Sequence, residues 1–310
     1  MTNVSTDYFK YQKQYEDTYG EKTVILYQLG QFYEVYAYYD DQNNIIGKAR
    51  EIGPLINFVV SRKNKKLDIS FSNPIQVGIN IATFDKSLRI LMENQWTVVI
   101  VSQKPQSETS KYIEREVTHI YSPGTYIEET SLNTYIGCIY VSKSKNWAIG
   151  VSLCDMSTGE IHVYYADSCE ELCRITESYK PKEVVLLNES GDDNIKDYIN
   201  QTLISEKQVG MFKNINYQTE VFAKVYKSQS LLTYHEQFDI ERYPEISVSL
   251  AYLLQFCYEH NSKYTEKLQY PVFGTTNGLV IHNNALSQLN VIDCKKSLFE
   301  IVESVFRWIY

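Results

Sequence analysis

The chain has 310 residues, of which 44% are hydrophobic and 22% are charged, a composition that argues against a disordered protein and gives room for two packed domains. The net charge of −8 argues against a uniformly basic nucleic-acid-binding protein. The first 125 residues nevertheless carry equal numbers of basic and acidic side chains. Any contact with nucleic acid should therefore lie on local patches of this first part.

Membrane insertion, secretion and metal binding find no support in the sequence. It contains no apolar run of about 18 residues, and Met1–Lys10 lacks the basic start and apolar stretch of a secretory signal. Its cysteines form no CxxC pair, which is typical of free thiols in a reducing compartment. Cys169 and Cys173 are four apart in a helical pattern, but no second ligand pair lies nearby, so we expect no metal site.

The first part of the chain alternates helix and strand signals. We expect a helix over Tyr8–Tyr19, capped by Ser5-Thr6-Asp7 and ended by Gly20, and then a buried strand over Thr23–Leu29. Gly30 interrupts the pattern. Further predicted features are a basic loop over Arg62–Lys66, an amphipathic helix over Phe84–Asn94, a second buried strand over Thr97–Val101, and a turn at Ser122-Pro123-Gly124-Thr125.

From about Leu132 the pattern changes to strands followed by a helix. Predicted strands cover Tyr135–Val141, Ala148–Leu153, Glu160–Tyr165 and Glu183–Leu187, with a turn at Asp155–Gly159 and helices over Cys169–Tyr179 and Ser247–His260. The sequence therefore predicts a second α/β domain with a mixed sheet. We expect domains at 1–125 and 135–260, joined by a linker at 126–134. A further segment, 265–310, has helical patterns and reaches Tyr310 without a cap, so we expect the natural chain to continue.

One stretch is especially informative: Tyr27-Gln28-Leu29-Gly30-Gln31-Phe32-Tyr33-Glu34. It resembles the signature of the mismatch-binding domain of the MutS family, in which a buried strand, a glycine and one polar residue precede Phe-x-Glu. Four other resemblances follow in the family's order: Gln95–Gln103, Glu114–Val117 with Ser122–Thr125, Asp155–Glu160, and Asn283–Asn290, which is similar to the start of the lever (core) domain. Together they cover essentially the whole chain.

The resemblance implies a fold and a function. It implies a mixed-sheet mismatch-recognition domain, an RNase-H-like connector domain and the start of an α-helical core domain. It also implies DNA mismatch repair as an intracellular, DNA-associated protein that binds double-stranded DNA with mispairs or small loops. As a full-length protein it would be a dimeric clamp and a DNA-dependent ATPase using ATP and Mg²⁺. No GxxxxGK[ST] phosphate loop occurs in the 310 residues, so the resemblance implies no enzyme activity or cofactor for this chain itself.

By resemblance, Phe32 is a wedge and Glu34 hydrogen-bonds the displaced base. An apolar wedge entering the minor groove costs a few kcal/mol of unstacking at a paired step and less at a mispair, so it tests deformability instead of sequence. A carboxylate is repelled by phosphates, so Glu34 needs such a compensating contact. Arg62, Lys63, Lys65 and Lys66 lie where the family has a basic loop that touches the DNA backbone, and Arg115 is a second candidate backbone contact.

The chain departs from the family at two places. Gly78-Ile79-Asn80 stands where the family usually has Gly-x-Pro, and Val101-Ser102 replaces its Cys-Glu. These departures indicate a divergent branch and leave the neighbouring DNA contacts open.

Two alternative functions remain open. The first is an RNase-H-like, metal-dependent nuclease using Asp155 and Glu160, although such a site needs several converging carboxylates and Asp155 stands in a turn where Asp is common. The second is a MutS paralogue acting in recombination, against which the presence of Phe-x-Glu argues. The five histidines show no pattern of a catalytic triad.

Overall fold

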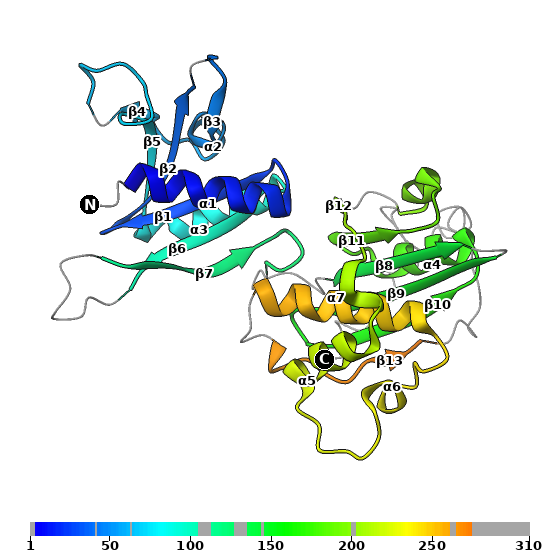
Figure 1. The fold of residues 1–310 in the computed structure, drawn as a ribbon. Helices are drawn as coiled ribbons and strands as arrows, with labels where there is room; N and C mark the ends of the chain where they lie inside the picture. The colour runs from blue at the N-terminus through cyan, green and yellow to red at the C-terminus, as the bar shows by residue number, and fades with distance from the viewer. Residues whose placement is uncertain are drawn as a thin grey trace, which may run out of the picture. The chain divides into compact units, whose positions relative to one another are not determined.

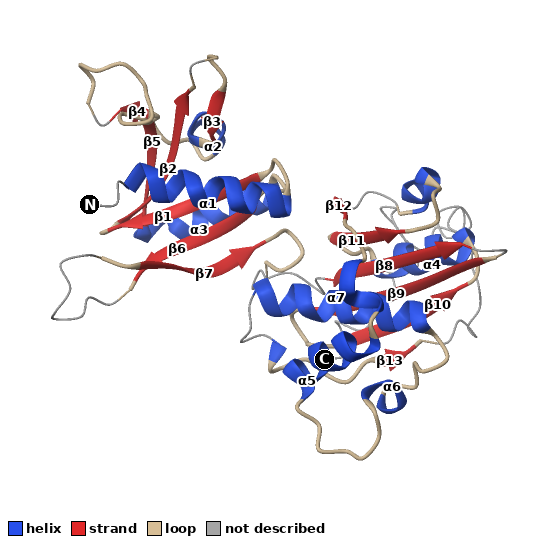
Figure 2. Ribbon diagram, viewed as in Figure 1, coloured by secondary structure: helices blue, strands red, loops and turns tan. Residues whose placement is uncertain are grey.

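The structure is a computed structural model that describes residues 4–40, 42–62, 64–104, 113–126, 135–143, 146–199, 203–260 and 265–274. The chain divides into two compact units, one drawn from 1–134 with 255–267 and the other from 135–254 with 268–310. Both combine a mixed sheet with helices, which confirms the predicted fold class (Figure 2). Most of the predicted linker 126–134, and the part of the predicted core segment 265–310 that follows residue 274, lie outside the described residues.

The first unit is a sheet with strand order β4-β5-β2-β1-β6-β7, in which β3 also pairs with β2. Only β1 and β6 are parallel to each other. The strands are β1 (Thr23–Leu29), β2 (Phe32–Tyr39), β3 (Ile45–Gly47), β4 (Ser61–Arg62), β5 (Ile75–Asn80), β6 (Thr97–Gln103) and β7 (Arg115–Tyr121). The helices are α1 (Val4–Tyr19), α2 (Ala49–Leu55), the 3₁₀ helix η1 (Ile81–Thr83) and α3 (Phe84–Glu93).

Both faces of this sheet are covered, because its central strands place apolar side chains alternately on either side. Val24 and Leu26 pack with residues of α2 and α3, whereas Ile25 and Tyr27 pack with Tyr8 and its neighbours on α1. Figure 1 shows α1 and α3 on opposite faces. The predicted N-cap at Ser5-Thr6-Asp7 is wrong: α1 begins at Val4, which already packs against the apolar cluster between α1 and the sheet.

The second unit is a sheet of order β12-β11-β8-β9-β10-β13. The strands β8, β9 and β10 form an antiparallel meander. The strands β11 and β12 run parallel to β8, which is the predicted RNase-H-like topology. The strands are β8 (Tyr135–Lys143), β9 (Trp147–Asp155), β10 (Ile161–Ala166), β11 (Glu183–Asn188), β12 (Leu203–Glu206) and β13 (Val272–Phe273). The helices are α4 (Cys169–Tyr179), η2 (Asp193–Tyr198), η3 (Gly210–Lys213), α5 (Ile215–Tyr226), α6 (Tyr234–Gln237) and α7 (Pro244–His260).

Helices also cover this second sheet. Ser168 caps α4 by accepting from the Glu171 N–H, and the buried face of α4 packs on β9 and β11 through Leu172. The first turns of α7 lie against β9 at Gly150, where a Cβ would come within 2.2 Å of the Glu245 backbone. A glycine is therefore required for this close approach. The predicted start of α7 at Ser247 is three residues late, because Pro244, preorganised for a first helical position, begins the helix.

Candidate nucleic-acid interface

The Phe-x-Glu sequence lies at the tip of the β1–β2 hairpin. Leu29 pairs with Phe32, so the connection is the two residues Gly30 and Gln31. Gly30 has a φ of +60°, as the first position of a tight two-residue hairpin requires, and glycine adopts this conformation without strain. The Ile81 N–H donates to the Gln31 carbonyl at 3.1 Å, which ties the turn to the end of β5.

The base of this hairpin is braced by Gln28 and Arg115. The Gln28 side-chain amide donates to the Gly30 carbonyl at 3.3 Å, and its Oε1 accepts from the Gln103 N–H at 2.8 Å. Arg115 donates from Nε to the Gln28 carbonyl at 3.0 Å and lies over the Tyr27 ring at 4.9 Å. Arg115, predicted as a DNA-backbone contact, is thus also part of the framework that holds the turn in place.

Phe32 and Glu34 lie on the same face of β2, because they are two residues apart in a strand. Phe32 is opposite Asn80, and Glu34 is opposite Gly78. A Cβ on Gly78 would lie 3.7 Å from Phe32 Cδ1, so the ring lies beside the bare backbone of Gly78. The Phe32 side chain is 44% exposed, and the neighbouring Ile81 is 40% exposed. The tip therefore presents two apolar side chains to solvent.

The neighbouring Tyr33 shows that the exposure of Phe32 depends on the face of β2 to which its side chain points. It points to the opposite side of β2, where its ring lies 5.0 Å from that of Phe84 in the core beneath α3. A shift of one residue in the pairing would exchange the two side chains. The two-residue turn fixes the register, and with it which aromatic ring faces solvent.

Glu34 is half-buried and has a partner on its own strand. The hydroxyl of Tyr36 donates a hydrogen bond to Glu34 Oε2. Burial, followed by the hydrogen bond and charge of Glu34, raises the pKa of Tyr36 far above its ordinary value of 10.0, so the phenol stays protonated and acts as a donor.

The predicted basic residues lie near the opposite end of β5. Arg62 is a strand residue, so the prediction that it belongs to a loop is wrong. The reason is its antiparallel pairing with Ile75 of β5. Lys65 and Lys66 are exposed in the following turn, and Lys63 lies outside the described residues. Five positions of β5 separate Ile75 from Asn80, the partner of Phe32, which corresponds to about 17 Å along a strand.

A buried amide organises the basic turn. The side chain of Asn73 is 5% exposed, and its Nδ2 donates to the carbonyls of Asn64, Leu67 and Asp68 at 3.0–3.2 Å. Its Oδ1 accepts from the Asn64 N–H at 3.1 Å. Arg62 Nη1 also donates to the Leu67 carbonyl at 3.2 Å. These bonds give the Lys65–Lys66 segment a defined shape.

Arg62 and Lys65 line a surface groove together with Arg50 of α2. The Arg50 guanidinium lies 5.0 Å from the centre of the Tyr39 ring. The remaining lining is mostly apolar: Pro54, Val59, Val60, Ser61, Ile69 and Ile75. The described lining thus holds three cations and no carboxylate, a charge distribution that suits a phosphate backbone.

The carboxylates of the nuclease hypothesis do not form a metal-binding nuclease site. Asp155 is 1% exposed, and its Oδ1 accepts from the N–H and hydroxyl of Ser157, as expected for a structural turn residue. Glu160 is exposed, with Oε2 at 3.8 Å from His162 Nε2. Among the described residues, no group of three or more His, Cys, Asp or Glu side chains could hold a metal ion.

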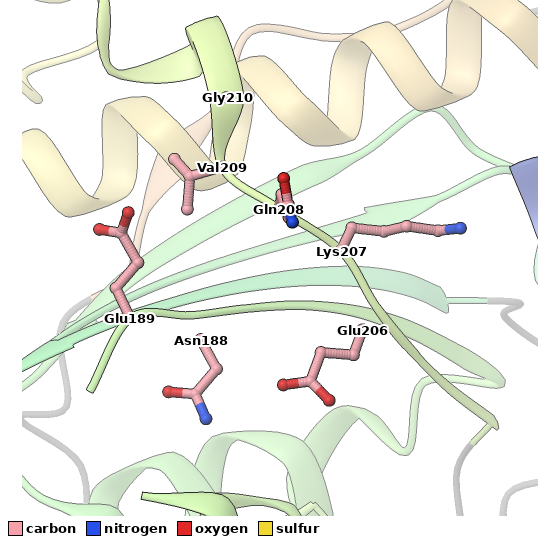
Figure 3. Close-up of a pocket in the computed structure, with 7 residues that line it drawn as sticks. All are labelled: Asn188, Glu189, Glu206, Lys207, Gln208, Val209 and Gly210. Carbon is pink, nitrogen blue, oxygen red and sulfur yellow. The ribbon is translucent and has the colours of Figure 1, made fainter. Parts of the chain in front are cut away.

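A second pocket lies at the carboxyl ends of the parallel strands β11 and β12, where open α/β sheets commonly bind ligands. Figure 3 shows that its two carboxylates, Glu189 and Glu206, point in opposite directions. Each is paired, Glu189 with Lys213 at 2.5 Å and Glu206 with Lys196 at 2.7 Å. The pocket therefore presents no converging group for chemistry.

Comparison with known proteins identifies the family. The model of MutS domain I matches residues 2–130, and that of MutS domain II matches residues 134–269. The chain belongs to the MutS family. A DNA mismatch repair protein mutS homologue of Acanthamoeba polyphaga mimivirus is 31% identical over 94% of the chain and 30% of its own length. The DNA mismatch repair proteins MutS of Thermodesulfovibrio yellowstonii and Thermotoga neapolitana are each 28% identical, over 66% and 60% of the chain.

The chain spans only 20–30% of the length of these MutS relatives. The two matched domains correspond to the two sheets, and the Phe32 hairpin belongs to MutS domain I. In the described part of the chain, no helix is long and apolar enough to cross a membrane.

Three residues of this site, Tyr36, Asn73 and Arg50, were not predicted from the sequence. Tyr36 could have been found, because it continues the period of two that links Phe32 with Glu34. Asn73 carries no local signal beyond its polar type. Arg50 is twelve residues from Arg62, and only the packing of α2 beside β4 and β5 brings them to one groove.

Proposed function

We propose that this chain recognises mismatched DNA in DNA mismatch repair, with Phe32 as the wedge that enters the minor groove and kinks the duplex. The observation that carries the proposal is the exposed Phe32 ring at the tip of a braced, two-residue hairpin in a MutS domain I. A wedge must be apolar, exposed and rigidly held if its insertion is to report the cost of unstacking instead of its own flexibility. The Phe32 hairpin has these three properties.

Glu34 adds selectivity in this proposal. Its carboxylate stands two residues behind the wedge on the same strand face, where it can accept a hydrogen bond from a displaced base. A phosphate-facing carboxylate weakens binding to paired DNA, whereas at an unstacked mispair the base contact offsets this repulsion. Glu34 thus raises the difference between mispaired and paired duplexes.

The cationic groove supplies affinity without selectivity. Its cations Arg50, Arg62 and Lys65 would contact phosphates, as would Lys66 in the adjoining turn and Lys63 of the same basic stretch. These contacts release counterions, so they make binding salt-dependent but not sequence-dependent. The groove lies about 17 Å along β5 from the partner of the wedge, close to five base-pair steps of a duplex. One duplex could therefore touch both places.

The mutS homologues named above are several times longer than this chain, which supports a function within a larger protein. We propose that the full-length protein is a dimeric clamp that uses ATP and Mg²⁺, with the 310 residues supplying the parts that read the mispair.

A direct test measures binding of the chain to matched fluorescent duplexes, one fully paired, one with a G·T mispair and one with a one-base loop. At low salt and micromolar protein, the mispaired and looped duplexes should bind more tightly than the paired one. Equal affinity for all three duplexes would contradict the proposal, and binding to none would show that the chain does not recognise DNA.

A further inference from the structure

The hydroxyl of Tyr36 holds the carboxylate of Glu34. Tyr36 follows Glu34 by two residues on the same face of β2, and its hydroxyl donates to Glu34 Oε2. The Tyr36 side chain is only 5% exposed, so its hydroxyl needs a partner inside the protein. In the described part of the chain, that partner is Glu34.

The donor is itself held rigidly. The Tyr36 ring meets the ring of Tyr8 edge to face, with the centroids 4.9 Å apart and the planes at 83°. Tyr8 is fully buried in α1, and Ile25 and Val99 belong to the same apolar cluster. A phenol packed in this way cannot follow a moving carboxylate, so it fixes one position of the Glu34 side chain.

The arrangement leaves one carboxylate oxygen for a ligand. Oε2 accepts from Tyr36, whereas Oε1 accepts no hydrogen bond from the described residues. A carboxylate has four acceptor sites on two oxygens, so one intramolecular bond leaves capacity for a base. Holding a glutamate beforehand removes the cost of ordering its three rotatable bonds when the base arrives.

We propose that Tyr36 is a positioning residue that fixes the Glu34 carboxylate for hydrogen bonding to a displaced base, and so sets part of the preference for mispaired DNA. This inference rests on the proposed function of Glu34. It goes beyond it because it assigns a role to a buried side chain that touches no DNA. Tyr36 acts through Glu34 alone, so its effect must vanish when the Glu34 carboxylate is absent.

The test is a double-mutant cycle of wild type, Tyr36→Phe, Glu34→Ala and the double variant. The quantity measured is the ratio of affinities for the G·T duplex and the paired duplex. Tyr36→Phe keeps the buried ring and removes only the donor. It should lower the ratio about two- to tenfold in the wild-type background, the cost of ordering one free side chain. In the Glu34→Ala background it should have no effect.

Tyr38→Phe is the matched control. Tyr38 lies on the same face of β2, and its ring packs on Phe9 and Phe71, away from Glu34. This variant should leave the ratio unchanged, and thermal unfolding of each variant verifies that the fold is kept.

Four results would overturn the inference. Equal losses from Tyr36→Phe in both backgrounds would show a structural effect, and no loss in either would show that the hydrogen bond is irrelevant. If Glu34→Ala lowers the ratio but Tyr36→Phe does not, the positioning role fails and the proposed function stands. If wild type itself shows no preference for the mispair, the proposed function fails, and the role of Tyr36 fails with it.

Discussion

Replacing Phe32 with alanine distinguishes a wedge from a core residue. The Phe32 ring is 44% exposed, so only about half of its surface leaves water on folding. Full burial of a phenylalanine side chain contributes about 1.5–3 kcal/mol, so Phe32→Ala should lower the free energy of unfolding by about half of this, about 0.8–1.5 kcal/mol. Water fills the space at the surface, and no cavity cost is added. A core phenylalanine costs about 3–5 kcal/mol when truncated.

The larger effect should appear in DNA binding. Loss of one aromatic side chain stacked on a base costs about 1–3 kcal/mol, which corresponds to roughly 5- to 140-fold in affinity for the mispaired duplex. The paired duplex should lose less, because a paired step resists unstacking and the wedge inserts there less often. The ratio of the two affinities should therefore fall toward one.

The assay combines urea unfolding with fluorescence anisotropy on the paired and G·T duplexes. Phe71 supplies the surface control, since it is 38% exposed in the same unit and packs only partly, against Phe9 and Tyr38. Phe71→Ala should cost a similar free energy of unfolding without changing the affinity ratio. Phe9, 8% exposed, supplies the core reference. A Phe32→Ala protein that loses about 3–5 kcal/mol of stability and keeps its affinity ratio would refute the role of Phe32 as a wedge.

Four further outcomes are expected. Glu34→Ala should raise affinity for paired DNA while lowering the G·T preference, because it removes a repulsive charge together with a base contact; a fall in both affinities by the same factor would contradict this. Arg50→Gln should reduce the slope of log affinity against log salt by about 1, equally for paired and mispaired duplexes. Arg89→Gln on α3, which lies outside the groove, should leave the slope unchanged. Equal slopes for the two variants would exclude Arg50 as a phosphate contact. Burial lowers the pKa of His235 below its ordinary 6.5. The stability that depends on its neutral form is therefore complete above pH 6.5 and is lost as the pH falls below that value. His235→Gln should show a smaller fall in Tm between about pH 7.5 and 5.5 than wild type, and an unchanged fall would contradict this expectation. The 310-residue chain alone should bind DNA weakly, because its first 125 residues carry no net charge; nanomolar, mispair-selective binding by the monomer at physiological salt would be inconsistent with this expectation.

Elements with a complete local signal were predicted to the residue. β1 covers Thr23–Leu29 because a β-branched, apolar run stands between two glycines, and α4 covers Cys169–Tyr179 because Ser168 caps an amphipathic stretch that ends before Pro181. The strands β3 and β4 have three and two residues, too few to show any periodicity. They exist because β2 and β5 offer unpaired edges, which is a tertiary cause that no window of sequence contains.

The same distinction between local sequence signals and tertiary causes applies to the candidate site. Phe32, Glu34 and the spacing between them can be found in the sequence, and so can the cluster of basic residues after Ser61. The strand pairings that place the two groups at opposite ends of β5 cannot, because they join residues that are between 13 and 48 positions apart, from Arg62 with Ile75 to Phe32 with Asn80. The groove likewise needs α2 to fold beside β4 before Arg50 and Arg62 become neighbours.

The separation of these two groups has a consequence for how a protein of this charge can select mispairs. A domain with equal numbers of acids and bases cannot hold DNA by its overall field, so affinity must come from the groove that contains cations and no carboxylate. Cations beside the wedge would stabilise every duplex equally and reduce the influence of unstacking on binding. On the strand face that carries Phe32, the charged residue of β2 is an acid, Glu34, which is held by a buried phenol, and Arg115 lies behind the turn, where it donates to the Gln28 carbonyl. Affinity and selectivity should therefore respond to different substitutions, with groove variants changing the salt slope and variants of Phe32, Glu34 and Tyr36 changing the mispair ratio.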